Sequence, residues 1–124
     1  MSIKLGSLDA DNLRRREIAQ RYIAEIKNPK ITLPTYEGKA DHVFHLFVVQ
    51  VEDRAAVVAH LIENKVGHLI HYPIAPHQQK ALPELKDLSF PVAEALHHHV
   101  VSIPMSPVMT QDQVSKVISV LNSY

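Results

Sequence analysis

The segment "HVFHLFVVQVEDRAAVVAHLIENK", residues 42–65, carries two hydrophobic patterns in succession. Residues 42–51 are rich in β-branched and aromatic side chains and are apolar on both pleat faces, which predicts a central strand buried on both sides. A helix is expected next, because Asp53 stands at an N-cap position. The apolar residues of this helix recur at helical spacing: Val57, Val58, Leu61 and Ile62.

A second strand is expected at about residues 66–72. A strand, a helix and a strand with short connections form a βαβ-like unit, provided that the two strands are neighbours. From residue 73 to residue 88 the prolines exclude regular structure apart from a turn or two. The pattern indicates an α/β fold class.

The residues before this unit predict a helix and a short strand. In residues 8–27, Ile18, Tyr22 and Ile26 recur every four positions and form a narrow apolar stripe. The other faces of this helix carry arginines, which favours a solvated surface over an anion-binding patch. A short strand is expected at residues 31–33.

The residues after the unit predict a helix, a strand and a second helix. Ser89 is the expected N-cap of a helix over residues 89–99. A short strand, "VVSI", follows and ends before Pro104. Thr110 and Gln113 have the spacing of a capping box, so a helix is expected after Thr110.

The composition limits the class of protein. With 124 residues, of which 46% are hydrophobic and 21% charged, the chain is expected to fold as one soluble unit. Lysine plus arginine and aspartate plus glutamate number 13 each, so no broad positive field attracts nucleic acid. The chain has no cysteine, no signal-peptide pattern and no apolar run near the roughly 20 residues that cross a membrane, which predicts a cytoplasmic protein without membrane contact.

Nine histidines are the compositional oddity, and a metal site is one hypothesis for them. His97, His98 and His99 are consecutive, so on a helix they point about 100° apart and cannot all bind one ion. An HExxH motif, a GxSxG motif, a cysteine nucleophile and a phosphate-binding glycine loop are all missing from the sequence. We therefore expect no metal site and none of the common self-contained enzymes.

The stretch "HLIHYPIAPHQQ", residues 68–79, concentrates three histidines and a tyrosine on one proline-rich bend. A strand that ends in His71 and Tyr72 before Pro73 presents an imidazole and a phenol on a stiff loop. These groups can hydrogen-bond the hydroxyls or phosphate oxygens of a polar ligand. From the residues alone, ligand contact and structural packing are equally good interpretations.

Four segments of the chain, taken together, resemble the C-terminal part of the DegT/DnrJ family of pyridoxal-phosphate-dependent nucleotide-sugar aminotransferases. These segments are "NLRRREIAQRY", "HVFHLFVVQVEDR", "LIHYPIAPHQQKAL" and "SIPMSPVMTQDQVSKVISVLN". The segment "IHYPIAPHQQ" is most similar to family members that make 3-amino-3,6-dideoxyhexoses on a thymidine diphosphate carrier.

The resemblance implies the small C-terminal domain of a fold-type-I transferase, an α+β sandwich with a small mixed or antiparallel sheet covered by helices. Residues 1–28 are then an N-terminal helix leading into the domain, and residues 29–124 are the small α/β domain. Family members are homodimers whose large domain holds pyridoxal phosphate (PLP) on a lysine. None of the lysines in this chain has a setting like that of the family's cofactor-binding loop, so the resemblance implies no cofactor and no catalysis in this chain alone.

The resemblance also implies roles for four residues. His71 and Tyr72 are expected at the sugar-binding mouth of the active site, with His77 on the same loop, where they position the nucleotide sugar. His45 is expected on the central strand at the domain junction, although a hydrogen-bonded core histidine is the preferred interpretation for it. The family often has glycine where this chain has Lys65, so the helix end at residue 65 lacks the usual left-handed glycine.

The leading hypothesis is therefore a C-terminal piece of an aminotransferase, from a truncated gene or cut at the domain boundary. The intact enzyme is expected to take its amino group from glutamate and to serve surface polysaccharide, lipopolysaccharide or O-antigen synthesis. Its partners are expected to be the large aminotransferase domain, the nucleotide-sugar substrate and, because apolar surface is left open, a second copy. The alternatives are a non-catalytic interaction or regulatory module and a histidine-rich metal-binding domain.

Overall fold

Three short strands and four α-helices make up the structure, a computed structural model that describes residues 5–124. Two 3-10 turns, η1 and η2, lie between α3 and α4. The elements in chain order are α2 (Leu8–Glu25), β1 (Ile31–Thr32), β2 (Phe47–Val51), α3 (Arg54–Glu63), η1 (Pro76–Gln78), η2 (Pro83–Leu85), α4 (Pro91–His99), β3 (Val100–Ile103) and α5 (Gln111–Asn122). The expected α/β class, in its form with a small antiparallel sheet and helices, is confirmed.

The sheet has the strand order β1-β2-β3, and both pairings are antiparallel. Val48 lies opposite Ser102 in the register of β2 and β3. Beyond β3, Leu69 pairs with Ser102 through two backbone hydrogen bonds of 2.9 and 3.0 Å, and this bridge is isolated. The prediction of a strand over residues 66–72 is therefore wrong. At Tyr72 the chain takes a positive φ of 52° and then meets Pro73, so it leaves the sheet after one bridge.

Because β3 pairs antiparallel with both of its neighbours, residue 69 runs parallel to β2 with β3 inserted between them. The condition for a simple βαβ unit, that the two strands are neighbours, is thus not met. The helix between them, α3, forms as expected, with the Asp53 carboxylate accepting a 2.9 Å hydrogen bond from the Ala56 amide. Ile62 is 60% exposed, so its expected place on the buried face is wrong.

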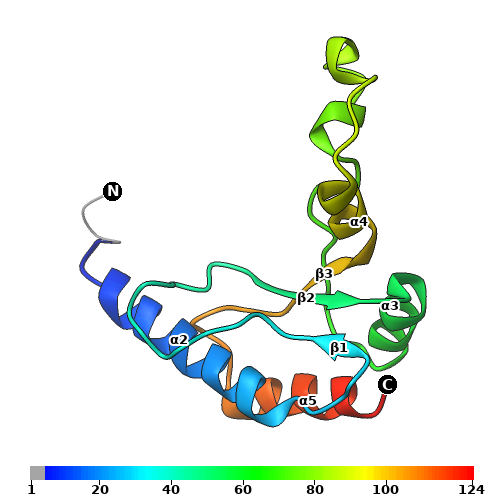
Figure 1. Cartoon of the computed structure of the whole chain (residues 1–124). Coiled ribbons are helices and arrows are strands. Elements are labelled where there is room, and N and C mark those ends of the chain that lie inside the picture. Colours follow the sequence, from blue (N-terminus) through cyan, green and yellow to red (C-terminus); the bar gives the residue numbers. More distant parts are fainter. Residues whose placement is uncertain (1–4) are drawn as a thin grey trace.

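Only one face of β2 is covered. Phe47, Val49 and Val51 are buried, whereas Val48 is 38% exposed and Gln50 is also exposed. Figure 1 shows α2 and α5 lying together along one side of the sheet, and it is against this side that the buried residues pack. The expectation of a strand over residues 42–51 that is buried on both faces is therefore wrong, because no helix of the described chain covers the second face.

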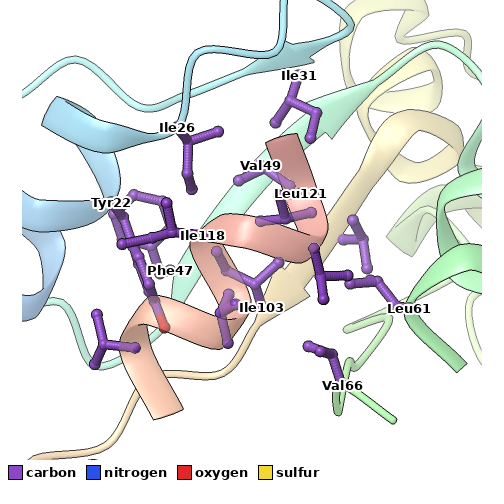
Figure 2. Close-up of a cluster of buried hydrophobic side chains, with 14 of the residues drawn as sticks. Tyr22, Ile26, Ile31, Phe47, Val49, Leu61, Val66, Ile103, Ile118 and Leu121 are labelled. Carbon is purple, nitrogen blue, oxygen red and sulfur yellow. The ribbon is translucent and has the colours of Figure 1, made fainter. Parts of the chain in front are cut away.

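The core lies between this covered face and the helices, as Figure 2 shows. Helix α5 contributes most to it, and its start is fixed by the expected capping box. Thr110 Oγ1 accepts from the Gln113 amide at 3.2 Å, and Gln113 Oε1 accepts from the Thr110 amide at 2.9 Å. Its buried side chains follow the predicted helical spacing: Val114, Val117, Ile118, Val120 and Leu121.

Two of the arginines of α2 bind the first turns of α5 and the residue shortly before it. Arg14 donates to the Met109 carbonyl at 3.0 Å. Arg21 donates to the side chains of Gln111 and Ser115 at 2.8 and 3.1 Å, and it also pairs with Glu25. These two side chains stay partly exposed, as expected for a solvated helix surface, and they also tie α2 to its neighbouring helix.

Tyr22 joins α2 to the sheet. Its side chain is fully buried, its ring meets Phe47 edge-on with the centroids 5.1 Å apart, and its hydroxyl donates to the Pro104 carbonyl at 2.8 Å. Burial raises the pKa of this phenol well above its usual value, so the hydroxyl keeps its proton and remains a donor. One side chain thus supplies both packing and a hydrogen bond to the segment that follows β3.

Helix α3 ends in a Schellman motif with lysine at the left-handed position. The Lys65 amide donates to the Ile62 carbonyl at 3.0 Å, and the Val66 amide donates to the Leu61 carbonyl at 2.9 Å. Lys65 has a φ of 55°, which a side chain with a Cβ atom adopts at a cost. The missing glycine noted in the sequence is therefore replaced by a strained lysine.

Replacing Tyr22 with phenylalanine is expected to lower the free energy of unfolding by about 1 to 2 kcal/mol, because the partly buried Pro104 carbonyl loses its donor while the packing stays the same. Urea denaturation followed by circular dichroism measures the change. Tyr36→Phe is the control, since that hydroxyl binds the Lys39 carbonyl in an exposed loop. Equal stability of the two variants would contradict the role given to Tyr22.

Replacing Lys65 with glycine is expected to raise the free energy of unfolding by about 0.5 to 1 kcal/mol, because glycine adopts a positive φ without the Cβ clash. Lys65→Ala serves as the control, since alanine removes the long side chain and keeps the clash. If the glycine variant unfolds at a lower urea concentration than the alanine variant, residue 65 is not strained.

Candidate functional site

Between Leu69 and β3 the chain leaves the sheet and forms an arm, residues 72–99, which Figure 1 shows projecting away from the helical side. The arm contains η1, η2 and α4. Among its residues only Ala75 and His77 are buried. Six of its large apolar side chains are 42 to 76% exposed: Tyr72, Ile74, Leu88, Phe90, Val92 and Leu96.

The uncovered face of the sheet lies at the base of the arm. We call it the open face, and it is formed by Leu46, Val48, Leu69, His71 and Ser102. The three apolar residues of this set are 38 to 56% exposed. A shallow hollow of about 280 Å³ lies over it, with both polar side chains in its lining. This face combines exposed apolar surface with two polar groups.

His71 lies on the open face and is held by β3. Its Nδ1 atom is 3.0 Å from the Ser102 hydroxyl, which belongs to a residue only 6% exposed. This contact engages one ring nitrogen and leaves Nε2 as the ring atom that can meet a ligand. Ser102 is a candidate site residue that the sequence analysis missed, and the alternation of β3 opposite β2 was a signal for it.

Tyr72 follows His71 and is 73% exposed. The two rings have centroids 6.4 Å apart, so the structure brings these expected site residues together. The Tyr72 carbonyl accepts a hydrogen bond from His97 Nδ1, which lies 25 positions further along the chain. The phenol therefore extends from a fixed piece of backbone at the base of the arm.

His77 is placed differently, within the arm. It is 4% exposed, its Nε2 lies 3.0 Å from Glu94 Oε1, and its ring meets Phe90 edge-on at 5.0 Å. Glu94 Oε1 also accepts the Phe90 amide at 2.7 Å. This Phe90 hydrogen bond, and after it the bond to His77, lowers the pKa of Glu94.

Helix α4 begins at Pro91 with Phe90 as its N-cap residue, so the expected cap at Ser89 is wrong. The physical reason is that the Glu94 carboxylate, rather than a serine hydroxyl, accepts the amide at the start of the helix. Because the same carboxylate oxygen holds His77, one acidic side chain joins η1 to α4 and keeps the two limbs of the arm together.

His45 precedes β2 and is exposed. The interpretation as a hydrogen-bonded core histidine is therefore wrong. The strand begins two residues later than His45, at Phe47, and the buried ring of this loop is Phe44, which stacks on Phe47 with centroids 5.8 Å apart. His45 is not brought into contact with His71 or Tyr72 by any interaction described for residues 5–124.

Two of the three consecutive histidines at residues 97–99 bind backbone carbonyl groups. His97 donates to Tyr72, and His99 Nδ1 lies 2.9 Å from the Val51 carbonyl and 3.2 Å from that of Glu52. Across residues 5–124 the structure contains no group of three or more histidine, aspartate or glutamate side chains that could hold a metal ion.

A cofactor-binding lysine needs a protected pocket, because desolvation and nearby charge set its reactivity. All lysines from Lys27 onward are exposed, and Lys4 lies outside the described residues. The lysines described here therefore do not fit a covalent PLP site.

Within residues 5–124, no helix is long and apolar enough to span a membrane.

Comparison with known proteins gives a match over nearly the whole chain. The model of the DegT/DnrJ/EryC1/StrS aminotransferase family matches residues 1–122. A dTDP-3-amino-3,6-dideoxy-alpha-D-galactopyranose transaminase from Aneurinibacillus thermoaerophilus is 52% identical over 124 residues, which are 100% of this chain and 34% of that protein. The chain thus spans about a third of the length of this relative.

Solved structures agree in fold. DesV from S. venezuelae, in complex with ketimine intermediate, has a TM-score of 0.90 and 32% identity, with 98% of this chain and 34% of that chain covered. NtdA from Bacillus subtilis, with bound cofactor PMP, has a TM-score of 0.79 and 33% identity, with 90% of this chain and 28% of that chain covered. The arrangement of strands and helices is therefore that of one part of these larger proteins.

Acid is expected to loosen the arm before it unfolds the core. Since the folded-state pKa of Glu94 is lowered, its contribution is present above the unfolded value and is lost as the pH falls through the folded value. Hydrogen exchange of the Phe90 amide, measured from pH 7 down to pH 3 and corrected for intrinsic rates, should show falling protection below about pH 4.5.

Glu94→Gln is the control, because an amide side chain still accepts the Phe90 hydrogen bond and does not titrate in this range. Protection of the Phe90 amide in this variant should not change with pH over the same interval. An identical pH dependence in both proteins would mean that Glu94 does not hold the arm.

Proposed function

This chain belongs to the DegT/DnrJ/EryC1/StrS aminotransferase family, and from this premise we propose that it is the C-terminal part of an enzyme that transfers an amino group to a keto sugar carried on a nucleotide. The observation that carries the proposal is the 52% identity to a sugar-nucleotide transaminase along the whole of this chain. We assign the large domain, which would hold the cofactor, to the two thirds of such an enzyme that this chain does not cover.

The substrate class follows from the names of the relatives. One relative is named for dTDP-3-amino-3,6-dideoxygalactopyranose, and another, at 32% identity, for dTDP-3-amino-3,4,6-trideoxyglucose. We assign to this protein a dTDP-linked 3-keto-6-deoxyhexose as amino acceptor and glutamate as amino donor. A cytoplasmic location and a role in lipopolysaccharide or other surface glycan synthesis belong to the same proposal.

His71 and Tyr72 are the residues that we place against the substrate. The Ser102 hydroxyl fixes the His71 ring, so that its Nε2 atom can hydrogen-bond a sugar hydroxyl or a diphosphate oxygen. The exposed Tyr72 phenol supplies a second hydrogen bond beside it. Their part is positioning, because neither group needs to form a covalent bond with the sugar.

The other two histidines have different roles in this proposal. His77 is buried against Glu94, so we assign to it the holding of the arm rather than contact with the substrate. His45 is exposed in the bend that leads to β2, and we assign it to the domain junction.

PLP, when bound in the intact enzyme, supplies the electron-withdrawing ring on which the amino group is carried. Because the described lysines of this chain are all exposed, we assign the lysine that binds it to the large domain. The residues of this chain then orient the sugar and close one side of the site against water. Alone, the chain is not expected to transaminate.

The large domain is the partner that we assign to the open face and the arm. Both carry large apolar side chains that are far more exposed than those of the core, and such surfaces are typical of interfaces. Residues 1–28 lead into the small domain of residues 29–124 in this arrangement. When the large domain is missing, the same surfaces favour association of the chain with a second copy.

A chimera tests the proposal. The corresponding third of the A. thermoaerophilus relative is replaced by this chain, and amino transfer from glutamate to a dTDP-linked 3-keto-6-deoxyhexose is measured with PLP present. We expect an active enzyme in which Tyr72→Phe or His71→Ala raises KM about tenfold, the effect of one lost hydrogen bond to a charged or polar group.

His98→Ala is the matched control, because His98 is exposed and belongs to the same chain segment as the bound histidines. It should leave KM unchanged. A folded chimera that binds PLP and lacks activity, or one in which both Tyr72→Phe and His71→Ala retain the parent KM, would contradict the proposal.

A further inference from the structure

His97 makes a contact that the proposed function does not use. Its Nδ1–H donates to the Tyr72 carbonyl, although the two residues are 25 positions apart in the sequence. A carbonyl oxygen only accepts, so the ring must carry its proton on Nδ1. The contact therefore acts on the backbone of Tyr72 and leaves its phenol free.

The backbone at Tyr72 needs such a contact. Its φ is 52°, which costs about 1 kcal/mol or more for a residue with a Cβ atom. Pro73 adds to this cost, because a following proline favours an extended conformation at the residue before it. A strained residue keeps its conformation only where the surrounding structure holds it.

The turn at Tyr72 is held by two contacts, which come from different elements. On one side, His71 is bound to Ser102 of β3 at 3.0 Å. On the other, the Tyr72 carbonyl is bound to His97 at the end of α4. Without the second contact, the backbone after Tyr72 has only the arm to restrain it.

The end of α4 is itself fixed to the sheet. Arg54, the first residue of α3, donates from Nη1 to the His97 carbonyl, where a positive charge is favourable at a helix C-terminus. Two residues later, His99 binds the carbonyls of Val51 and Glu52 at the end of β2. His97 is therefore held in place relative to the sheet, and its hydrogen bond holds the backbone of Tyr72 in place.

We propose that His97 is a positioning residue for the substrate. By donating Nδ1–H to the Tyr72 carbonyl it fixes the left-handed turn at Tyr72 and so orients the exposed phenol toward the bound nucleotide sugar. This inference rests on the proposed function, which places Tyr72 against the sugar. His97 does not touch the substrate, so its effect is on binding rather than on the chemical step.

The first test uses nuclear magnetic resonance on the 124-residue chain. The intraresidue amide-to-Hα Overhauser effect of Tyr72, which is strong when φ is positive, should be strong in the parent and in His97→Asn, whose amide N–H takes the place of Nδ1–H. It should be weak in His97→Ala. His98→Ala is the matched control and should resemble the parent.

The Phe90 amide, at the other end of α4, reports in each variant whether the helix remains folded. If His97→Ala unfolds the arm, the comparison of parent with His97→Asn decides, and a weak effect in a folded His97→Asn overturns the proposal. A strong Tyr72 effect in a folded His97→Ala also overturns it, because the turn then needs no help from residue 97.

The second test uses the chimera. His97→Ala should raise KM for the dTDP-linked sugar about fivefold, the size expected when one neutral hydrogen bond is lost, with kcat nearly unchanged, and His97→Asn should restore the parent KM. A fall in kcat at constant KM overturns the proposal. If Tyr72→Phe leaves KM unchanged while the resonance test succeeds, it is the substrate role of Tyr72 in the proposed function that fails.

Discussion

Helices cover only one face of the three-stranded sheet in the described residues, and this asymmetry determines where the core and the exposed apolar surface lie. Helices α2 and α5 bury alternate residues of β2 and leave Val48 and its neighbours exposed. Tyr22 and the capped α5 make the covered side a complete core. The exposed side is therefore a surface with its own chemistry, and the arm rises beside it from residue 72.

The open face and the arm explain the concentration of histidines in this chain. His71 is held by a strand, His97 and His99 bind backbone carbonyls, and His77 pairs with Glu94 inside the arm. Imidazole suits these places because it hydrogen-bonds at either ring nitrogen on a compact side chain. Of the histidines in the bend, His77 is packed inside the arm, which fits the structural interpretation, and His71 is the one for which we propose ligand contact.

Much of the fold could be predicted from local sequence. The capping box at Thr110, the cap at Asp53 and the periodic residues of α5 act within a few positions of the chain, and the structure confirms them. Most of the errors concern residues whose environment is set from far away, whereas the expected cap at Ser89 failed because of the nearby Glu94. An apolar strand does not reveal whether its second face is covered by the same chain, so both-sided burial was predicted where one side is open. Likewise, the contacts of Ser102, Glu94 and His97 join elements 17 to 31 positions apart and leave no local pattern.

We propose that the large domain of an aminotransferase covers the open face and the arm. Hydrogen exchange followed by mass spectrometry can detect this cover, by comparing this chain alone with the same residues inside the active chimera. We expect slower exchange at the amides of the arm, residues 72–99, in the chimera, with unchanged exchange in α5, whose apolar side is already buried. Equal exchange of the arm in both proteins would contradict the claim.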